Sequence, residues 1–476
     1  MKVLKGFIWK SLQQYSTAFL KFVFQVLLAR MLSPNEFGIL AEMLVFIAVA
    51  EAFANGGFGT ALIQKRNADE IDFGTSLVSC FFISISLYFA IFFLAPKIAF
   101  FYGEEELVGL LRVFGLSIPF YSFNSIQNAF LLKKYETKMI FLSSFISTVI
   151  SGVIAVFIAY RGGGAFSLVL QNLLAIIGNV IILQVLSKWH PSIVFSRIRF
   201  KTLFSFSWKI VLASVLGNVL ENIYNLFIGK NYNSEVLGYY NRGNSFPSTI
   251  IGQLRTAVSA MTLPYFSNNQ ETKEQLLKKV KKITRLSATI MFPMSFGLAA
   301  IAEPLVQLLL TDKWLPCVFF LRLECVFYGT LPIAASVTNA MIAVGRSDLS
   351  LKIEGIKLFL TIISVGVAGK FSVEILCIVR VAISIIIILI SVMFSRKTIG
   401  YSFQMLLDDI WIPFILSFGM GVLCYYVGML SDDILIKLSV QIIAGILSYS
   451  IGVLLFMKKD VQEIRNLLRK YIDSKI

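Results

Sequence analysis

The feature that most constrains this chain is a series of fourteen apolar stretches, each about the length of a membrane span. A transmembrane helix needs about 20 mostly apolar residues. Only 15% of the 476 residues are charged, against roughly 25% in a soluble domain, so a soluble enzyme, a disordered chain and a nucleic-acid reader are excluded. The sequence predicts an all-α polytopic membrane protein. The expected spans lie near 11–31, 39–62, 75–95, 107–131, 139–160, 165–187, 206–228, 245–267, 284–310, 317–343, 352–369, 373–395, 410–430 and 434–457.

The basic residues predict how the spans are oriented. With the N-terminus inside, the inner connections and tail hold 28 Lys and Arg residues and the outer connections hold 7. Lys and Arg accumulate on the cytoplasmic side of membrane proteins. This asymmetry therefore predicts a multi-pass protein with both termini in the cytoplasm, and it explains the net charge of +16 without a nucleic-acid partner.

The connections leave little room for soluble chemistry. None exceeds about 20 residues, and no phosphate-binding G-x-x-x-x-G-K-[ST] loop occurs. The chain has a single histidine, and its five cysteines lie mostly inside apolar runs with no C-x-x-C motif. We therefore expect no bound metal, no cofactor and no histidine-based catalysis.

Weak internal repetition suggests two halves. Residues that match recur in order at offsets that grow slowly from 199 to 211: Trp9-Lys10 with Trp208-Lys209, Arg30 to Gly38 with Lys230 to Gly238, Arg112 with Arg322, and Asn128-Ala129 with Asn339-Ala340. An even number of spans separates equivalent points, so both copies cross the membrane in the same direction. Such parallel repeats predict two pseudo-symmetric six-helix lobes around a central cavity. The expected lobes are 1–190 and 191–400, followed by two extra transmembrane helices at 401–457 and a basic amphipathic cytoplasmic tail at 458–476.

Polar residues within the spans are the candidate site. An intramembrane charge costs about 2.5–3.5 kcal/mol on insertion scales, so it usually faces a cavity or a partner. At helical spacing, the first and second spans together, and the seventh and eighth together, offer a cation and an acid in a polar stripe. Hydrogen bonding that only joins helices is the alternative reading for the small polar residues, and Arg322 with Glu324, or Glu374 with Arg380, are expected structural pairs. The candidates are Lys21, Arg255, Arg30, Gln14, Gln25, Glu51, Asn55, Asn218, Glu221, Asn222 and Ser259.

Four segments carry a resemblance to a known family: LLARMLSPNEFG (27–38), GYYNRGNSFPSTIIGQLRTAVSAMTLPYFS (238–267), DKWLP (312–316) and NAMIAVGRSDL (339–349). The chain resembles the polysaccharide transporters, or Wzx-type oligosaccharidyl-lipid flippases, of the multidrug/oligosaccharidyl-lipid/polysaccharide exporter superfamily. The WzxC and teichuronic-acid exporter group is the most similar branch.

This resemblance implies a V-shaped pair of helical bundles with a cationic cavity. It implies transfer of a polyprenyl-pyrophosphate-linked oligosaccharide to the outer leaflet of the bacterial cytoplasmic membrane, for O-antigen, capsule, exopolysaccharide or teichuronic acid synthesis. Lys21 and Arg255, with Arg30, are then expected to bind pyrophosphate, while Glu51 and Glu221 are coupling candidates. A polymerase and glycosyltransferases are expected partners, beside membrane lipids.

Three alternatives stay open from the sequence. A small-molecule or drug exporter of the same superfamily is expected to have an acid-rich cavity. A membrane enzyme of glycan assembly is expected to carry a long outer loop or a histidine acid–base pair. A scaffold for glycan synthesis is expected to tolerate loss of its intramembrane charges.

Overall fold

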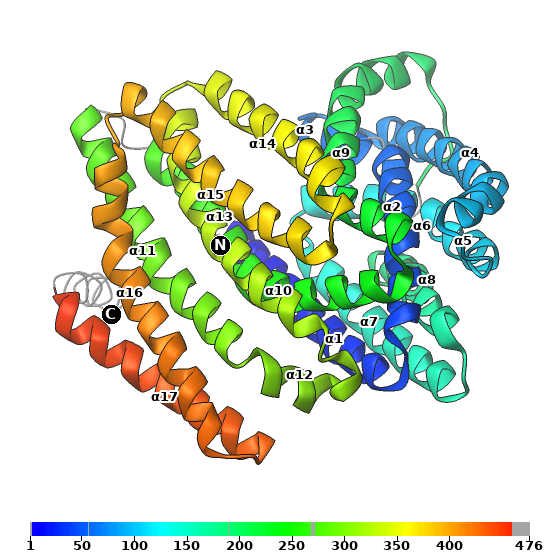
Figure 1. The fold of residues 1–476 in the computed structure, drawn as a ribbon. Coiled ribbons are helices and arrows are strands. Elements are labelled where there is room, and N and C mark those ends of the chain that lie inside the picture. The colour runs from blue at the N-terminus through cyan, green and yellow to red at the C-terminus, as the bar shows by residue number, and fades with distance from the viewer. Residues whose placement is uncertain (1, 56, 190, 268–271, 459–476) are drawn as a thin grey trace. The chain divides into compact units, whose positions relative to one another are not determined.

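The computed structural model describes residues 2–55, 57–189, 191–267 and 272–458, and this part of the chain is helical with no strand (Figure 1). The N-terminal helices are α1 (Lys2–Met31), α2 (Pro34–Asn55), α3 (Phe58–Gln64), α4 (Glu70–Tyr102), α5 (Leu107–Gly115), α6 (Ser117–Lys133), α7 (Thr137–Tyr160), α8 (Gly164–Ser187) and α9 (Arg197–Asn231). The others are α10 (Ser234–Ser267), α11 (Lys273–Ala300), α12 (Ala302–Leu310), α13 (Cys317–Ala343), α14 (Ser347–Val367), α15 (Val373–Thr398), α16 (Phe403–Val427) and α17 (Ile434–Phe456). The predicted tail 458–476 lies outside the described residues except for Lys458.

The lengths and composition of the helices confirm an all-α, multi-pass membrane protein. Eleven helical stretches of the described chain are long and apolar enough to cross a bilayer. The three other predicted spans coincide with α1, α10 and α14, helices of 30, 34 and 21 residues that carry more polar side chains. At 1.5 Å per residue even the shortest of them reaches about 30 Å. The count of fourteen spans stays a prediction.

Three predicted spans are interrupted in the structure, and the one expected at 39–62 forms α2 and α3, which are separated at Gly57. The stretch expected at 107–131 forms α5 and α6, which are separated at Leu116, and the stretch expected at 284–310 is divided at Ile301. In the last case α11 also begins at Lys273, so the basic cluster expected in a cytoplasmic connection is helical. Hydropathy locates the apolar residues of a helix but not its ends, because a helix can continue into neighbouring polar residues.

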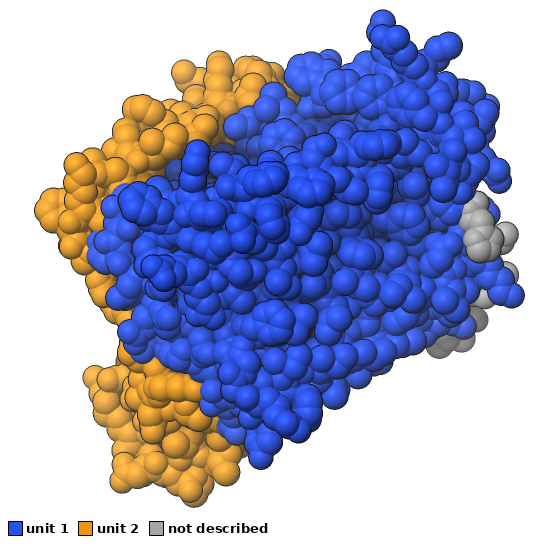
Figure 2. Space-filling view, turned by 90° about the vertical axis from the view of Figure 1, so that its right-hand side faces the viewer, with its two compact units in different colours: residues 1–241 blue, residues 242–476 orange. Residues whose placement is uncertain are grey.

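The chain packs into two compact units, residues 1–241 and 242–476, which Figure 2 colours separately. Unit 1 contains α9, which packs against α2 and α4. In unit 2, the extra helix α16 packs against α11 and α17. These packing units are not the repeat units, so the lobes 1–190 and 191–400 stay a prediction.

A face of small residues explains the packing of α7 in unit 1. Ser144, Ser147, Ser151 and Gly152 are buried at helical spacing, where α7 meets α1 and α8. The Ser147 and Ser151 hydroxyls donate to carbonyls one turn back, at 3.1 and 3.2 Å. A Cβ on Gly152 would lie 2.3 Å from the ring of Phe24. Small residues allow such close helix approach in membranes, where no hydrophobic force draws helices together.

The repeated hairpins of unit 1 have the same boundaries at an offset of 200. One hairpin has a helix ending at Met31 and the next beginning at Pro34, and the other has Asn231 and Ser234. Where α2 crosses the start of α10, a Cβ on Gly38 would lie 1.6 Å from the Ser234 carbonyl oxygen. Reciprocally, a Cβ on Gly238 would lie 1.9 Å from the Pro34 carbonyl oxygen. The matched glycines are therefore the two halves of one pseudo-symmetric contact.

The start of α4 is held by a buried carboxylate. Asp69 and Asp72 form a reciprocal capping box, in which the Asp72 N–H donates to the Asp69 carboxylate at 2.9 Å. This backbone hydrogen bond is the main cause that lowers the pKa of Asp69. The Asp72 side chain is fully buried and accepts from Lys65 at 2.6 Å, and Arg199 on α9 lies 3.5 Å away. Asp72 therefore ties α4 to both α3 and α9.

Replacing Asp72 by alanine is expected to destabilise the protein by about 3–5 kcal/mol, because it removes the buried anion that compensates Lys65. Thermal unfolding in detergent measures the effect. The matched control is Glu70→Ala, because the Glu70 side chain is exposed in the same helical turn. An equal loss of stability in both variants would contradict the assigned role of Asp72.

Candidate functional site

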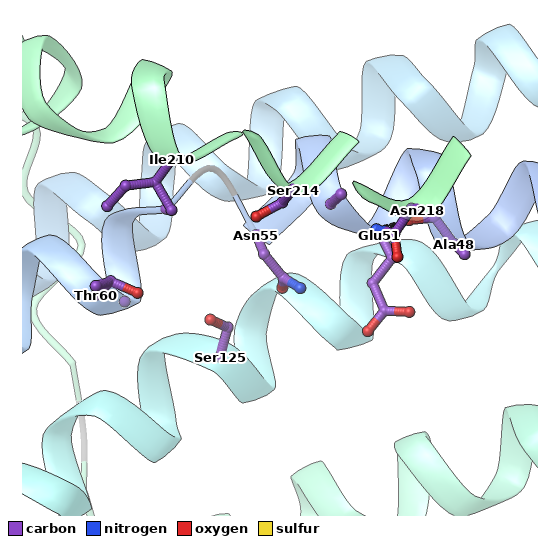
Figure 3. Close-up of a pocket in the computed structure, with 11 residues that line it drawn as sticks. Ala48, Glu51, Asn55, Thr60, Ser125, Ile210, Ser214 and Asn218 are labelled. Atoms are coloured by element: carbon purple, nitrogen blue, oxygen red, sulfur yellow. Dashed lines mark hydrogen bonds between the residues drawn. The ribbon is translucent and has the colours of Figure 1, made fainter. Parts of the chain in front are cut away.

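Unit 1 contains a polar cavity of about 390 Å³ between α2, α3, α6 and α9. Glu51 and Asn55 project from one side of α2, one helical turn apart, toward the helix that carries Ser125 (Figure 3). The cavity is lined by Ala48, Glu51, Ala52, Asn55, Gly57, Gly59, Thr60, Ser125, Ile210, Ser214 and Asn218. Three of the predicted residues, Glu51, Asn55 and Asn218, therefore meet in one place.

A chain of amides fixes the α9 side of this cavity. The Asn218 side chain donates to the Ala48 carbonyl of α2 at 3.3 Å. Asn222 donates to the Asn218 carbonyl at 2.9 Å, and Asn225 to the Asn222 side-chain oxygen at 3.1 Å. Asn222 thus extends the stripe behind Asn218 instead of lining the cavity. On the α2 side, the buried Asn55 Oδ1 has no hydrogen-bond partner in the described structure, so an acceptor remains available there.

Lys21 and Gln25 of α1 line a second, smaller cavity of about 40 Å³. Gln171 and Asn172 of α8 contribute amides to the same wall. Lys21 and Glu51 attract each other electrostatically, yet in the described part of the chain neither side chain forms a hydrogen bond or a salt bridge. The cation and the acid expected on the first two helices are therefore near each other, and both side chains can still form hydrogen bonds with a ligand.

The other unit 1 candidates lie away from these cavities. Gln14 is exposed on α1, two turns before Lys21. Arg30 is exposed in the last turn of α1, where a cation is favoured by the helix dipole. Glu221 is exposed on α9. The structure does not bring these three side chains together with Glu51 and Asn218.

Arg255 belongs to unit 2. It lies on α10, where its buried Nε has no hydrogen-bond partner among the described residues. Tyr328 of α13 is within electrostatic range of the guanidinium, and Gly252 lies 3.4 Å from the same tyrosine ring, measured from an added Cβ. Arg255 is thus a partly buried cation of α10 whose Nε can still donate a hydrogen bond. The side chain of Ser259 lies outside what the structure describes.

Sequence reasoning missed several polar residues that line the two cavities. Thr60 and Ser125 contribute hydroxyls to the larger cavity, and Gln171 and Asn172 contribute amides to the smaller one. The signal for the amides was present, because Gln171 and Asn172 are adjacent in an otherwise apolar span. Single hydroxyls are too common in membrane helices to identify a cavity.

The arrangement suits a ligand rich in hydroxyl groups. Carboxylate, amide and hydroxyl side chains converge on the larger cavity, and such groups fix the orientation of a bound ligand. Among the described residues, no group of three or more His, Cys, Asp or Glu residues could hold a metal ion. The expectation that the protein needs no cofactor stays a prediction.

Solved structures share the fold. The inward closed conformation of lipid II flippase MurJ superposes with a TM-score of 0.77 at 16% identity, over 95% of this chain and 99% of that chain. An inward-facing multidrug resistance MATE family transporter of the MOP superfamily gives a TM-score of 0.62 at 15% identity, over 82% and 94%. At these identities the likeness establishes the fold alone.

Three curated proteins are similar in sequence. Teichuronic acid biosynthesis protein TuaB of Bacillus subtilis is 24% identical over 428 residues, 89% of this chain and 88% of TuaB. Lipopolysaccharide biosynthesis protein WzxC of Escherichia coli is 23% identical over 435 residues, 89% of this chain and 87% of WzxC. Succinoglycan biosynthesis transport protein ExoT of Rhizobium meliloti is 26% identical over 306 residues, 64% of this chain. That match spans 62% of ExoT, less than two thirds of its length.

The comparison that defines the family is a match over most of the chain. The family model described as "Polysaccharide biosynthesis protein" matches residues 27–319. The matched region includes the turns of both repeated hairpins, the larger polar cavity with Glu51, and Arg255. The chain belongs to the polysaccharide biosynthesis protein family.

Proposed function

We propose that the protein moves a polyprenyl-pyrophosphate-linked oligosaccharide from the cytoplasmic to the outer leaflet, for the synthesis of a surface polysaccharide. The observation that carries the proposal is the polar cavity inside an apolar helical unit, where Glu51, Asn55 and Asn218 converge. A sugar must cross about 30 Å of hydrocarbon. A hydrogen-bonding cavity replaces its hydration shell during the passage, while the polyprenyl chain stays in lipid.

Intramembrane cations would bind the pyrophosphate. Lys21 has no salt-bridge partner in the described chain and lies beside a polar cavity. Arg255 has a buried Nε that forms no hydrogen bond with any described residue. Arginine and lysine form short, charge-assisted hydrogen bonds with phosphate oxygens. Each would therefore stabilise the charged pyrophosphate, the part of the substrate with the largest free-energy cost of leaving water. Arg30 is exposed at the end of α1, which the predicted topology places on the outer side, so it would attract the headgroup as it leaves.

The proposal includes the location and the partners. The protein would lie in the bacterial cytoplasmic membrane with both termini in the cytoplasm, as the distribution of its Lys and Arg residues indicates. It would act by alternating access without making or breaking a covalent bond. Glycosyltransferases would supply its substrate and a polymerase would consume the transferred glycolipid, so both would work beside it.

One observation favours a second candidate, a small-molecule or drug exporter. The lining of the larger cavity contains the acid Glu51 and no basic residue. A carboxylate in a polar cavity would bind an organic cation as well as a sugar hydroxyl. The relatives named for polysaccharide biosynthesis support the flippase over this alternative.

A leaflet assay tests the proposal. In a strain that lacks the gene, a labelled lipid-linked oligosaccharide is expected to stay on the cytoplasmic face, and the wild-type chain to restore transfer. Arg255→Ala and Lys21→Met are each expected to reduce the transfer rate about tenfold or more, because each removes a charged hydrogen bond to phosphate.

Two variants serve as matched controls. Lys10→Met changes a lysine of the same helix before the predicted span, and Arg396→Ala changes an exposed arginine in the last turn of α15. Both are expected to transfer at the wild-type rate. Glycolipid that reaches the outer face without the gene would overturn the proposal, and export of organic cations with Glu51 dependence would favour the second candidate.

A further inference from the structure

One buried serine in unit 1 contacts two carboxylates. The Ser234 hydroxyl, at the start of α10, lies 2.9 Å from Glu42 Oε1 of α2 and 2.9 Å from Glu104 Oε1. Glu104 reaches this point because Gly103, with a φ of 82°, ends α4 and reverses the chain. The Glu104 N–H then bonds the Ala99 carbonyl at 3.1 Å, which completes a Schellman-type end.

The hydrogen count of this contact leaves one proton unaccounted for. A serine hydroxyl has one hydrogen and can donate it to one acceptor, whereas an ionised carboxylate only accepts. Ser234 therefore satisfies one glutamate as a donor. The second contact, at the same 2.9 Å, is a full hydrogen bond when the other glutamate carries a proton and donates it to the serine oxygen, whereas two ionised glutamates would have to share the single hydroxyl hydrogen.

The surroundings also disfavour two negative charges. Glu42 is fully buried, and its second oxygen, Oε2, has no partner in the described structure. The buried Tyr102 hydroxyl of α4 is likewise without a partner and lies within electrostatic range of Glu42. A Cβ on Gly229 of α9 would lie 3.1 Å from Glu42 Cγ, so that helix closes the pocket. Two carboxylates that meet on one hydroxyl beside a buried pocket favour sharing one proton over carrying two negative charges.

Other charged groups around the site have different partners. Lys230 of α9 donates to the Phe101 carbonyl and lies 4.5 Å from the centre of the Phe101 ring. Glu235 of α10 is exposed and accepts from the Tyr239 hydroxyl. In the described part of the chain no basic side chain forms a salt bridge with Glu42 or Glu104, so a proton is the available countercharge.

We infer that Glu42, Ser234 and Glu104 form a proton-binding site that holds the crossing of α2 and α10 closed. The site lies directly on that crossing, because Ser234 supplies both the bridging hydroxyl and the carbonyl against which Gly38 packs. When the shared proton leaves to water, Ser234 can serve only one carboxylate, and the two anions repel each other. Raising the pH therefore opens the crossing, and lowering it closes the crossing.

The site would give the proposed flippase a driving ion. This step rests on the proposed function, whereas proton binding by the site does not depend on it. Loading from the more acidic side would close the crossing, and release on the other side would open it. Each cycle would move one proton. This assignment also gives a role to Glu42, which lies on the opposite face of α2 from the Glu51 cavity.

Distance measurements on the purified full chain in lipid nanodiscs test the inference. Spin labels at Asn35→Cys of α2 and Asn231→Cys of α9, two exposed positions beside the crossing, report the separation of the two hairpin turns by double electron–electron resonance. The native cysteines are buried, so labelling is selective. Above the site's pKa, the ratio of open to closed molecules is expected to rise about tenfold per pH unit, as one proton requires.

Three variants and one control identify the site. Glu42→Gln is isosteric with the protonated acid and is expected to stay closed at every pH, and Glu104→Gln to behave alike, because an amide donates without titrating. Ser234→Ala removes the bridge and is expected to be open at every pH. Glu105→Gln changes the adjacent exposed carboxylate and is expected to titrate like the wild type.

The outcomes separate this inference from the proposed function. A wild-type distance that does not change with pH, or a Glu42→Gln variant that still titrates, would overturn the proton site even if leaflet transfer is normal. A response to sodium at constant pH would replace the proton by a metal cation and overturn it as well. A normal pH response without glycolipid transfer would leave the site standing and remove the flippase.

Discussion

Replacing Gly38 by alanine is expected to lower the free energy of unfolding by about 3 kcal/mol, the upper end of the usual cost of overpacking. It is also expected to reduce leaflet transfer to background. The new Cβ would lie 1.6 Å from the Ser234 carbonyl oxygen, a backbone atom that cannot rotate away. Thermal unfolding in detergent and the leaflet assay measure the two effects. The helices must separate, so the proton site at Ser234 is disrupted as well.

The repeat supplies a second test of the same contact. Gly238→Ala is expected to have a similar effect, because its Cβ would lie 1.9 Å from the Pro34 carbonyl oxygen. The double variant is expected to be less destabilised than the sum of the two, since one separation relieves both clashes. Gly217→Ala is the matched control on α9, where no atom of the described residues lies within 4 Å of an added Cβ. It is expected to be neutral or slightly stabilising, because alanine favours helix.

An unfolding midpoint of Gly38→Ala equal to that of Gly217→Ala would mean that the hairpins are not held by this crossing. Full additivity of Gly38→Ala and Gly238→Ala would mean that the two glycines act at separate contacts. Either result would remove the structural reason for placing a proton-controlled closure at Ser234.

The helical class was predictable from the sequence because membrane helices satisfy their own backbone and need only an apolar run of sufficient length. The hairpin repeat was predictable from matched residues such as Gly38 and Gly238, whose shared constraint is steric. Which helices pack together was not predictable, since lipid is as apolar as the helix faces and small residues make many partners possible. The assignment of α9 to unit 1 is an example.

The candidate site was predicted in part. Helical periodicity correctly placed Glu51 and Asn55 on one side of α2, and the structure adds Asn218 from a helix more than 160 residues away in sequence. Arg30, Glu221 and Gln14 shared the same periodic signal and lie elsewhere, because periodicity selects a face without saying what it meets. The Glu42 contact required Glu104 and Ser234, which no local pattern connects to it.

Ion pairs illustrate the same limit. The predicted pairing of Arg322 with Glu324 is wrong, because residues two apart on a helix do not face each other. Glu324 of α13 instead pairs with Arg380 of α15 at 2.7 Å, and Arg322 lies 3.7 Å from Glu303. The partner of a buried charge is set by helix packing, so it becomes visible only in three dimensions.

Replacing Arg380 by methionine is expected to destabilise the protein by about 3–5 kcal/mol, measured by thermal unfolding in detergent. Glu324 is 2% exposed and Arg380 14% exposed, and the guanidinium also lies 4.1 Å from the centre of the Phe327 ring. The variant leaves the Glu324 charge buried without compensation, since its Oε2 already has no partner in the described structure. Most of the lost stability therefore comes from leaving the Glu324 carboxylate buried without a countercharge, and less from the lost attraction to Arg380.

The double variant Glu324→Gln with Arg380→Met separates these two contributions. It removes both charges and is expected to recover most of the lost stability, because a buried ion pair repays little more than its own desolvation. Lys357→Met is the matched control, since Lys357 and Glu354 form an exposed pair at 3.3 Å whose loss costs under about 1 kcal/mol. If the double variant remained as unstable as Arg380→Met alone, the pair would contribute through its own attraction, and unit 2 would depend on a charged link between α13 and α15 that apolar packing cannot replace.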